Sequence, residues 1–181
     1  MRRLRGAVDL SGLNMSLATG NRDAAAPGRL QQELRQNRPF ASLQAEAFLN
    51  AVRTADHLQH TLRQTLKPYG ITETQYNSLR ILRGAGEQGL TCSEIAQRLI
   101  SHDPDITRLL GRMERDGLVV RQRDTKDRRL VLTRIAKEGL AKLRELDKVV
   151  METVNRLLGE MTDAELRTMI SLLEKARGRS E

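Results

Sequence analysis

The segment from Ile106 to Ile135 changes its hydrophobic period from that of a helix to that of a β-strand within a few residues. Apolar side chains first recur at i, i+3, i+4 and i+7, and a glycine follows them: Ile106, Leu109, Leu110, Met113 and Gly117. The runs "LVVRQR" and "RLVLTRI" come next, joined by "DTKD". This order predicts one amphipathic helix followed by a short β-hairpin, a combination that few folds contain.

The hairpin carries most of the chain's positive charge. Between Arg121 and Lys137 there are seven basic and two acidic residues, a net charge of +5, whereas the whole chain has a formal charge of +8 and a pI near 10.3. Such a concentration favours a polyanionic partner, most commonly nucleic acid. The alternative at this level is a basic protein without such a partner.

The rest of the chain has helical patterns. One long amphipathic helix is predicted from Ser42 until Pro68 and Gly70 stop it, and two more are predicted from Lys137 to the C-terminus. Three capping-box pairs mark further helix starts: Thr72 with Gln75, Thr91 with Glu94, and Thr162 with Glu165. Aromatic residues make up only 2% of the chain, so the core must be aliphatic. We therefore predict a mostly α fold with a small β-hairpin wing.

A helix, a short helix, a capped helix and a basic hairpin follow one another in the order of a winged helix-turn-helix. Asp103 can cap the third helix, with Pro104 in its first position. Steps of 100° place a polar, basic face opposite the apolar stripe, and this face comprises Pro104, Thr107, Arg108, Gly111, Arg112 and Arg115. Arg108 is the leading candidate for reading a guanine, with Thr107 and Pro104 beside it, whereas Arg112 and Arg115 are expected to meet phosphates. A merely solvated helix face is the alternative.

Glycine inside this helix costs about 1 kcal/mol relative to alanine. This cost suggests that something approaches Gly111 closely, and two candidates stay open at this point: the DNA backbone and a crowded helix crossing.

The stretches "GITETQYNSLRILRGAGEQGLTCSEIAQRL" and "DPDITRLLGRMERDGLVVRQRDTKDRRLVLTRIAKEG" resemble the MarR family of bacterial transcriptional regulators, over about residues 42 to 177. The resemblance implies a homodimer formed by the first and the last two helices. It also implies that Arg129 enters the minor groove, that Asp127 orients nearby groups, and that Lys126 and Arg128 lie beside them on the wing. Gly111, where family members often carry an acidic residue, and Ala136, where they usually carry threonine, depart from the pattern.

The expected organisation is a flexible basic tail over residues 1–38 and a winged helix domain over 39–178. Within this domain, 39–70 and 137–178 are expected to dimerise and 71–136 to bind DNA. The expected function is sequence-specific binding of a pseudo-palindromic operator in double-stranded DNA, with repression as the default mode. The resemblance adds a small-molecule effector, often an aromatic or amphipathic anion, for which Tyr69 and Tyr76 are the available phenols.

Other functions have weaker support in the sequence. Cys92, the single cysteine, lies in the first turn of a predicted helix, where the helix dipole favours a thiolate and hence redox sensing. His57 and His60 lack further ligands at metal-binding spacing, and no phosphate-binding loop or nucleophile elbow suggests an enzyme. We expect no metal, no cofactor, no membrane span and a cytoplasmic location. A winged helix that binds RNA or protein stays open as an alternative.

Overall fold

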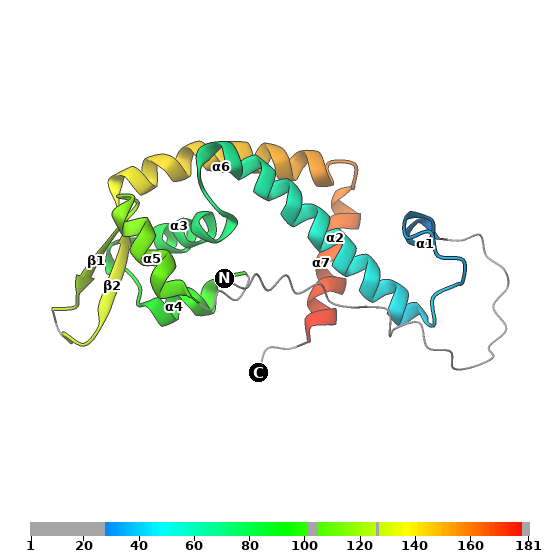
Figure 1. Cartoon of the computed structure of the whole chain (residues 1–181), viewed down its shortest axis with the longest axis horizontal. Helices are drawn as coiled ribbons and strands as arrows, with labels where there is room; N and C mark the ends of the chain where they lie inside the picture. The colour runs from blue at the N-terminus through cyan, green and yellow to red at the C-terminus, as the bar shows by residue number, and fades with distance from the viewer. Residues whose placement is uncertain (1–27, 101–104, 126, 179–181) are drawn as a thin grey trace, which may run out of the picture. The chain divides into compact units, whose positions relative to one another are not determined.

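The computed structural model describes residues 28–100, 105–125 and 127–178, and it contains helices with one two-stranded sheet (Figure 1). Short 3₁₀ turns at Lys67–Tyr69 and Gly86–Gln88 follow α2 and α3. The elements are α1 (Arg29–Glu33), α2 (Leu43–Leu66), α3 (Glu73–Ala85), α4 (Cys92–Arg98), α5 (Ile106–Arg115), β1 (Val119–Arg123), β2 (Val131–Ile135), α6 (Lys137–Leu158) and α7 (Asp163–Arg177).

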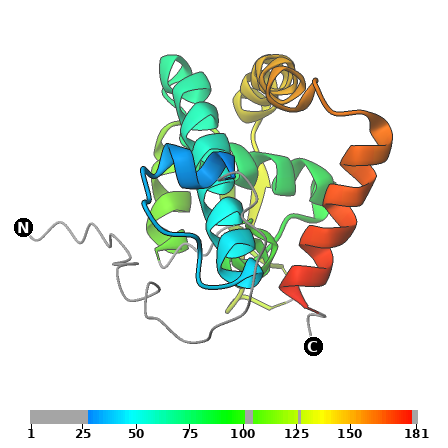
Figure 2. The ribbon, with the colours of Figure 1, turned by 90° about the vertical axis from the view of Figure 1, so that its right-hand side faces the viewer.

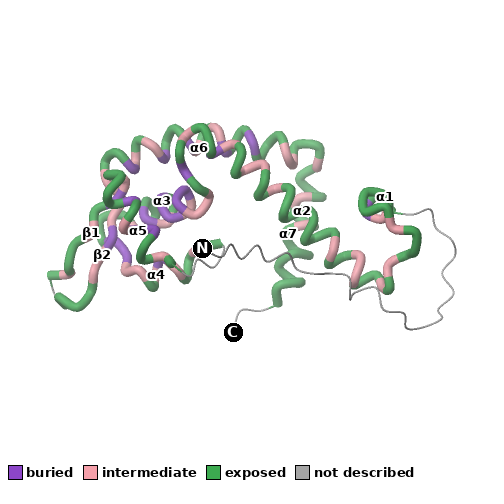
Figure 3. The backbone as a smooth tube through the Cα atoms, in the orientation of Figure 1, coloured by how far each residue is buried: buried purple, intermediate pink, exposed green. Residues whose placement is uncertain are grey.

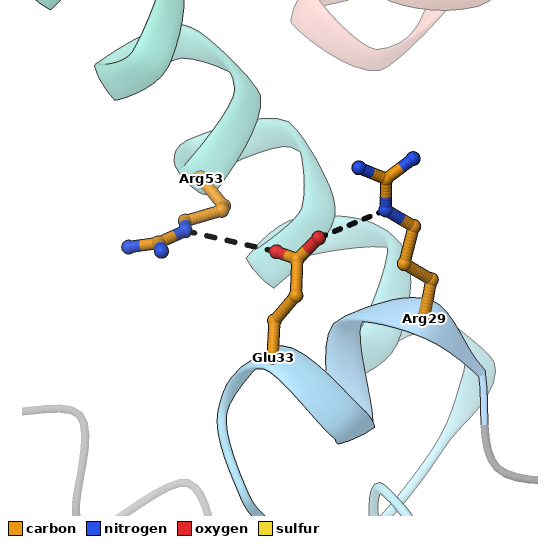
Figure 4. A network of polar contacts seen from close by, with 3 residues as sticks. All are labelled: Arg29, Glu33 and Arg53. Carbon is orange, nitrogen blue, oxygen red and sulfur yellow. Dashed lines mark hydrogen bonds and ion pairs between the residues drawn. The ribbon is translucent and has the colours of Figure 1, made fainter.

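Contacts within the chain separate it into two units, residues 1–58 and 59–181, and the division falls inside α2. In the first unit, the carboxylate of Glu33 on α1 lies 2.9 Å from Nε of Arg29 and 4.0 Å from Nε of Arg53 on α2 (Figure 4). Part of the segment assigned to the tail from sequence therefore forms a helical turn with an ion pair to α2. Residues 1–27 lie outside the described residues.

The helix starts predicted from capping boxes are confirmed. The hydroxyls of Thr72, Thr91 and Thr162 each accept a hydrogen bond from the backbone N–H three residues later, and the Gln or Glu at that position bonds back to the threonine N–H. Each box satisfies two N–H groups that a helix end would otherwise leave without a partner. The turn of the chain from α6 into α7, which ends in the last of these boxes, is visible in Figure 2.

The buried core of the second unit is aliphatic, as its composition predicts. Buried residues, purple in Figure 3, come from the end of α2, from α3, α4 and α5, from the sheet and from α6. The fully buried large side chains of this core are Leu66, Leu79, Leu82, Ile95, Leu110, Met113, Leu143 and Leu146. Each contributes roughly 1.5–3 kcal/mol relative to an exposed side chain, so this cluster holds the helix-turn-helix and the wing to α6.

The wing is an antiparallel hairpin in which Val119 pairs with Ile135, Arg121 with Thr133, and Arg123 with Val131. On its other side β2 pairs with Leu90, whose N–H and C=O both bond to Thr133, at 3.0 and 2.8 Å. Leu90 thus attaches the hairpin to the segment between α3 and α4. The mostly α fold with a β-hairpin wing is confirmed.

Candidate nucleic-acid interface

Helix α5 buries one face and exposes the other, as its periodicity predicts. Leu109, Leu110 and Met113 are buried, with at most 3% of their surface exposed. The other face carries exposed polar or basic side chains, those of Thr107, Arg108, Arg112 and Arg115. With one side anchored in the core, this helix can present three guanidinium groups to a ligand.

The beginning of α5 differs from the prediction. The helix begins at Ile106, with Asp105 as its N-cap residue and without a side-chain capping hydrogen bond. Asp103 and Pro104, predicted as the cap and the first helical position, lie outside the described residues. Asp105 Oδ2 lies 3.8 Å from Nη1 of Arg108, so the leading candidate for base reading has an acidic neighbour one turn away.

Gly111 lies on the half-exposed flank of α5, and a methyl group added to it would meet no atom of the described residues within 4 Å, apart from the backbone of α5 itself. A crowded helix crossing within the chain, one of the two explanations weighed from sequence, is therefore wrong. Space at this position is left for something outside the chain.

At the tip of the wing, the carboxylate of Asp127 accepts a hydrogen bond of 2.9 Å from the backbone N–H of Arg129. The Asp127 carbonyl accepts another, also of 2.9 Å, from the N–H of Leu130. This aspartate-based turn positions Arg128 and Arg129, whose side chains are exposed. Lys126 lies outside the described residues.

Two of the hairpin's cations are held by the protein itself. Arg121 is only partly exposed and pairs with Glu114 of α5, while Arg134 donates from Nε to the carbonyl of Glu87. Sequence reasoning counted both as part of one basic run and did not identify Glu114. Among the described residues of the hairpin region, the exposed cations are Arg123, Arg128, Arg129 and Lys137.

Cys92 and Thr107 join the two helices of the helix-turn-helix. The thiol sulfur of Cys92, at the start of α4, lies 3.4 Å from the hydroxyl oxygen of Thr107 in the first turn of α5. Thr107 was predicted to stand beside the base reader, and its hydroxyl is close to this thiol. Redox sensing by Cys92 stays a hypothesis from the sequence.

Comparison with known proteins identifies the class. Residues 71–131, which span α3 to the start of β2, match the model of the MarR family. The homoprotocatechuate degradative operon repressor of Escherichia coli is 30% identical over 113 residues, which make up 62% of this chain and 75% of the repressor. The chain belongs to the MarR family.

Solved structures agree with this assignment to the MarR family. The MarR transcription factor from Planctomyces limnophilus is 36% identical, with a TM-score of 0.59, over 75% of this chain and 98% of its own. BpsR from Bordetella bronchiseptica, whose DNA binding is regulated by 6-hydroxynicotinic acid, has a TM-score of 0.69 at 19% identity over 79% of this chain and all of its own. The MarR-family chain is a winged helix transcriptional regulator, and its relatives are regulators rather than enzymes.

Of the two tyrosines predicted for an effector cleft, one is buried and the other lines a hollow. Tyr76 is buried in the core, and its hydroxyl donates a 2.9 Å hydrogen bond to Asp147 of α6. Burial, with that hydrogen bond and the charge of Asp147, raises the pKa of Tyr76 to about 12. Tyr69 instead lines a hollow of about 480 Å³ between the end of α2 and α6. Of the two, only Tyr69 is placed to meet a ligand there.

Asp147 is the charged centre of the contact between α3 and α6. Burial opposes its ionisation, but hydrogen bonds from Arg83 and Tyr76 and the charges of Arg83 and Arg80 outweigh burial and hold its pKa below the usual value. The contact is structural, since Tyr76, Arg83 and Asp147 satisfy one another.

Two further findings concern the described residues only. Among them, no three His, Cys, Asp or Glu side chains form a group that could hold a metal ion. None of the helices described is both long and apolar enough to cross a membrane.

Proposed function

We propose that this MarR-family regulator binds a pseudo-palindromic operator as a homodimer, with α5 in the major groove and the wing in the flanking minor groove. The observation that carries the proposal is the exposed basic face of α5 next to the exposed arginines of the wing. In the proposed complex, residues 71–136 of each chain bind DNA, whereas residues 39–70 and 137–178 form the dimer contact. Regulation of DNA binding in BpsR, a neighbour in fold, is consistent with this proposal.

The residues have separate roles in the proposed complex. Arg108, in the first turn of α5, reads a guanine, and Thr107 and Pro104 contact a neighbouring base. Arg112 and Arg115 lie further along the helix and meet phosphates. Arg129 enters the minor groove, whose negative potential attracts a guanidinium group, with Lys126 and Arg128 beside it. Asp127 acts through the turn that it stabilises rather than through DNA.

Exposed apolar side chains on α2, α6 and α7 support the proposal that these helices form the dimer contact. Large hydrophobic residues with at least 38% of their surface exposed occur on α2, α6 and α7: Leu43, Phe48, Val52, Met151, Val154, Ile170, Leu172 and Leu173. These side chains remain exposed in a single copy of the chain, and a partner that buries them would stabilise the assembly, because exposed apolar surface in water is costly. A second copy of the chain is the partner that we propose.

The proposed effector binds in the hollow beside Tyr69. Its lining combines the ring of Tyr69 with two charged side chains of α6, the cation of Arg156 and the carboxylate of Glu152. The hydroxyls of Thr65 and Thr153, which lie 3.1 Å apart, complete the polar part of the lining. Both hydroxyls already donate to backbone carbonyls, those of Thr61 and Val149. In the proposed complex the carboxylate of an aromatic ligand therefore pairs with Arg156, and its ring contacts Tyr69. Such a ligand releases DNA only if it binds more tightly to the lobe arrangement that does not fit the operator.

Selection of bound sequences from random duplex DNA tests the function. An enriched two-fold motif with half-sites about one helical turn apart is expected, and its affinity should fall steeply with salt. Competition by single-stranded RNA or structured RNA should be weak at equal nucleotide concentration. If RNA competed as well as the selected duplex, the protein would be an RNA-binding winged helix. Action on the chromosome would also place the protein in the cytoplasm.

A further inference from the structure

We propose that Glu114 is a positioning residue for DNA recognition. Its contacts with Arg121 hold the wing strand β1 against the recognition helix α5, so that the helix and the wing bind the duplex in a fixed relative orientation. The inference rests on the proposed DNA-binding function. It concerns neither a base contact nor a phosphate contact, since Glu114 is acidic and acts through Arg121.

Glu114 contacts Arg121 twice. Its Oε1 accepts a hydrogen bond of 3.2 Å from the backbone N–H of Arg121, and its Oε2 lies 3.8 Å from the guanidinium Nη1 of the same residue. One carboxylate therefore holds both the main chain and the side chain of a single wing residue. Hydrogen bonds to ionised acceptors are stronger than neutral ones, and the main-chain contact fixes the strand itself.

The position of Arg121 in the sheet explains why its N–H is available. The N–H and C=O of its partner Thr133 bond to Leu90, on the far side of β2. Arg121 and Thr133 thus form a pair without mutual hydrogen bonds, in which the N–H groups point outwards. β1 is the outer strand of the hairpin, and Glu114 satisfies a main-chain donor that would otherwise lie unpaired at that edge.

The turn between α5 and β1 brings the two residues together. Gly117, with φ of +70°, donates to the carbonyl of Glu114, and Leu118 donates to that of Met113. This is a Schellman motif, which ends the helix and reverses the chain within two residues. The wing therefore returns beside the last turn of α5, where the Glu114 side chain reaches it.

The Arg121 side chain depends on Glu114. It is only 23% exposed, and among the described residues its buried Nε–H has no acceptor. Without the carboxylate, a partly buried cation loses the ion pair with Glu114, which favours a displaced side chain and a looser strand. A loose wing must be ordered when DNA binds, and this cost reduces what the wing contributes to affinity.

The test measures how much affinity for a selected duplex is lost on Arg129→Ala, first in the wild-type protein and then in the Glu114→Ala variant. This loss of affinity is the penalty of Arg129→Ala. In the Glu114→Ala background this penalty should be at least about threefold smaller than in the wild-type background, while the penalty of Arg108→Ala stays the same. If Glu114→Ala only destabilised the fold, affinity would fall by one common factor, and the penalties of Arg129→Ala and Arg108→Ala would both stay unchanged. Asp116→Asn is the matched control, because it removes a nearby negative charge without a contact to Arg121.

Amide exchange at Arg121 gives a second measurement. The N–H should exchange faster in Glu114→Ala but stay protected in Glu114→Gln, whose amide oxygen can still accept the bond. If Glu114→Ala does not fold, Glu114→Gln carries the affinity test, with a smaller fall in the Arg129→Ala penalty expected. Equal penalties in all backgrounds would overturn the role of Glu114, whereas a wild-type protein without sequence preference would overturn the DNA-binding function itself.

Discussion

The phenolic hydroxyl of Tyr76 donates a 2.9 Å hydrogen bond to Oδ1 of Asp147, which joins α3 of the helix-turn-helix to α6. Tyr76→Phe should lower the free energy of unfolding by about 1.5 kcal/mol, since the bond has an ionised acceptor and its loss leaves one carboxylate oxygen without this donor. Chemical denaturation measures this change. Tyr69→Phe is the control, because its hydroxyl makes no hydrogen bond to another described residue. An equal loss there would contradict the assignment.

The same contact predicts a dependence of stability on alkaline pH. The pKa of Tyr76 rises from 10.0 to about 12 in the folded protein, so between these values the unfolded chain releases a proton that the folded chain keeps. The contribution of Tyr76 is therefore complete below pH 10 and is lost as pH rises through this window. Denaturation at several pH values should show that the free energy of unfolding falls less steeply above pH 10 for Tyr76→Phe than for the wild type. Parallel curves for the two proteins would contradict this role of Tyr76.

Gly139→Ala should destabilise the protein by about 2 kcal/mol, because overpacking of a tight site typically costs 1–3 kcal/mol. A Cβ on Gly139 would lie 2.1 Å from the carbonyl oxygen of Leu118, which also accepts the N–H of Ala136. Neither backbone group can move freely. Thermal unfolding measures the effect. Gly84→Ala is a suitable control, since its added methyl group meets open space in α3; similar destabilisation of both would show that the contact is not responsible.

Gly111→Ala should have opposite effects on folding and on DNA binding. The free energy of unfolding should increase by about 1 kcal/mol, because alanine favours the helix and the site is empty. Affinity for the selected duplex should fall, since the methyl group stands where the DNA backbone is expected to approach. Unfolding and binding assays on the same sample separate the two effects. Unchanged affinity would show that nothing approaches Gly111 in the complex.

Arg108→Ala should cost about 1–3 kcal/mol on duplexes that keep one particular base pair and little on duplexes in which that pair is changed. The reason is that a guanidinium group bonds both acceptors of a guanine edge. Binding to a set of single-base operator variants measures it. Arg167→Ala on α7 serves as the control for lost charge. A uniform loss over all variants would make Arg108 a phosphate contact instead.

Val149→Phe should abolish release by the effector while DNA binding persists, because the ring occupies the hollow beside Tyr69. A panel of aromatic carboxylates that includes 6-hydroxynicotinic acid supplies the probe, chosen as the compound that most weakens binding of the wild type to the duplex. Lys148→Phe, next in the sequence but not part of the lining, should still respond. A Val149→Phe protein released at the wild-type concentration would place the effector elsewhere.

Local features of the chain were predicted well. The capping boxes at Thr72, Thr91 and Thr162, the apolar stripe of α5 and the two strands of the wing all appear where the sequence places them. These features depend on side chains within a few residues of one another, and periodicity reports which face of an element is apolar. The polar face of α5 follows from the same rule.

Features that depend on distant partners were not predicted. The basic run between Arg121 and Lys137 was treated as one charged surface, yet Arg121 and Arg134 bond to the protein. Glu87 and Asp147 accept bonds from residues 47 and 71 positions away, a separation at which no local pattern identifies a partner. Tyr76 was expected in a cleft for the same reason, although it is buried against α6.

The order of amphipathic helices and a basic hairpin, readable from residue types and spacing, determined the winged helix class of this MarR-family protein. Tertiary structure alone decided which cations remain exposed, which tyrosine borders a hollow, and that Glu114 secures the wing. Periodicity is a property of neighbouring residues, whereas the partner of a charged side chain is selected by chain reversals such as the one at Gly117, which bring distant groups within hydrogen-bonding reach.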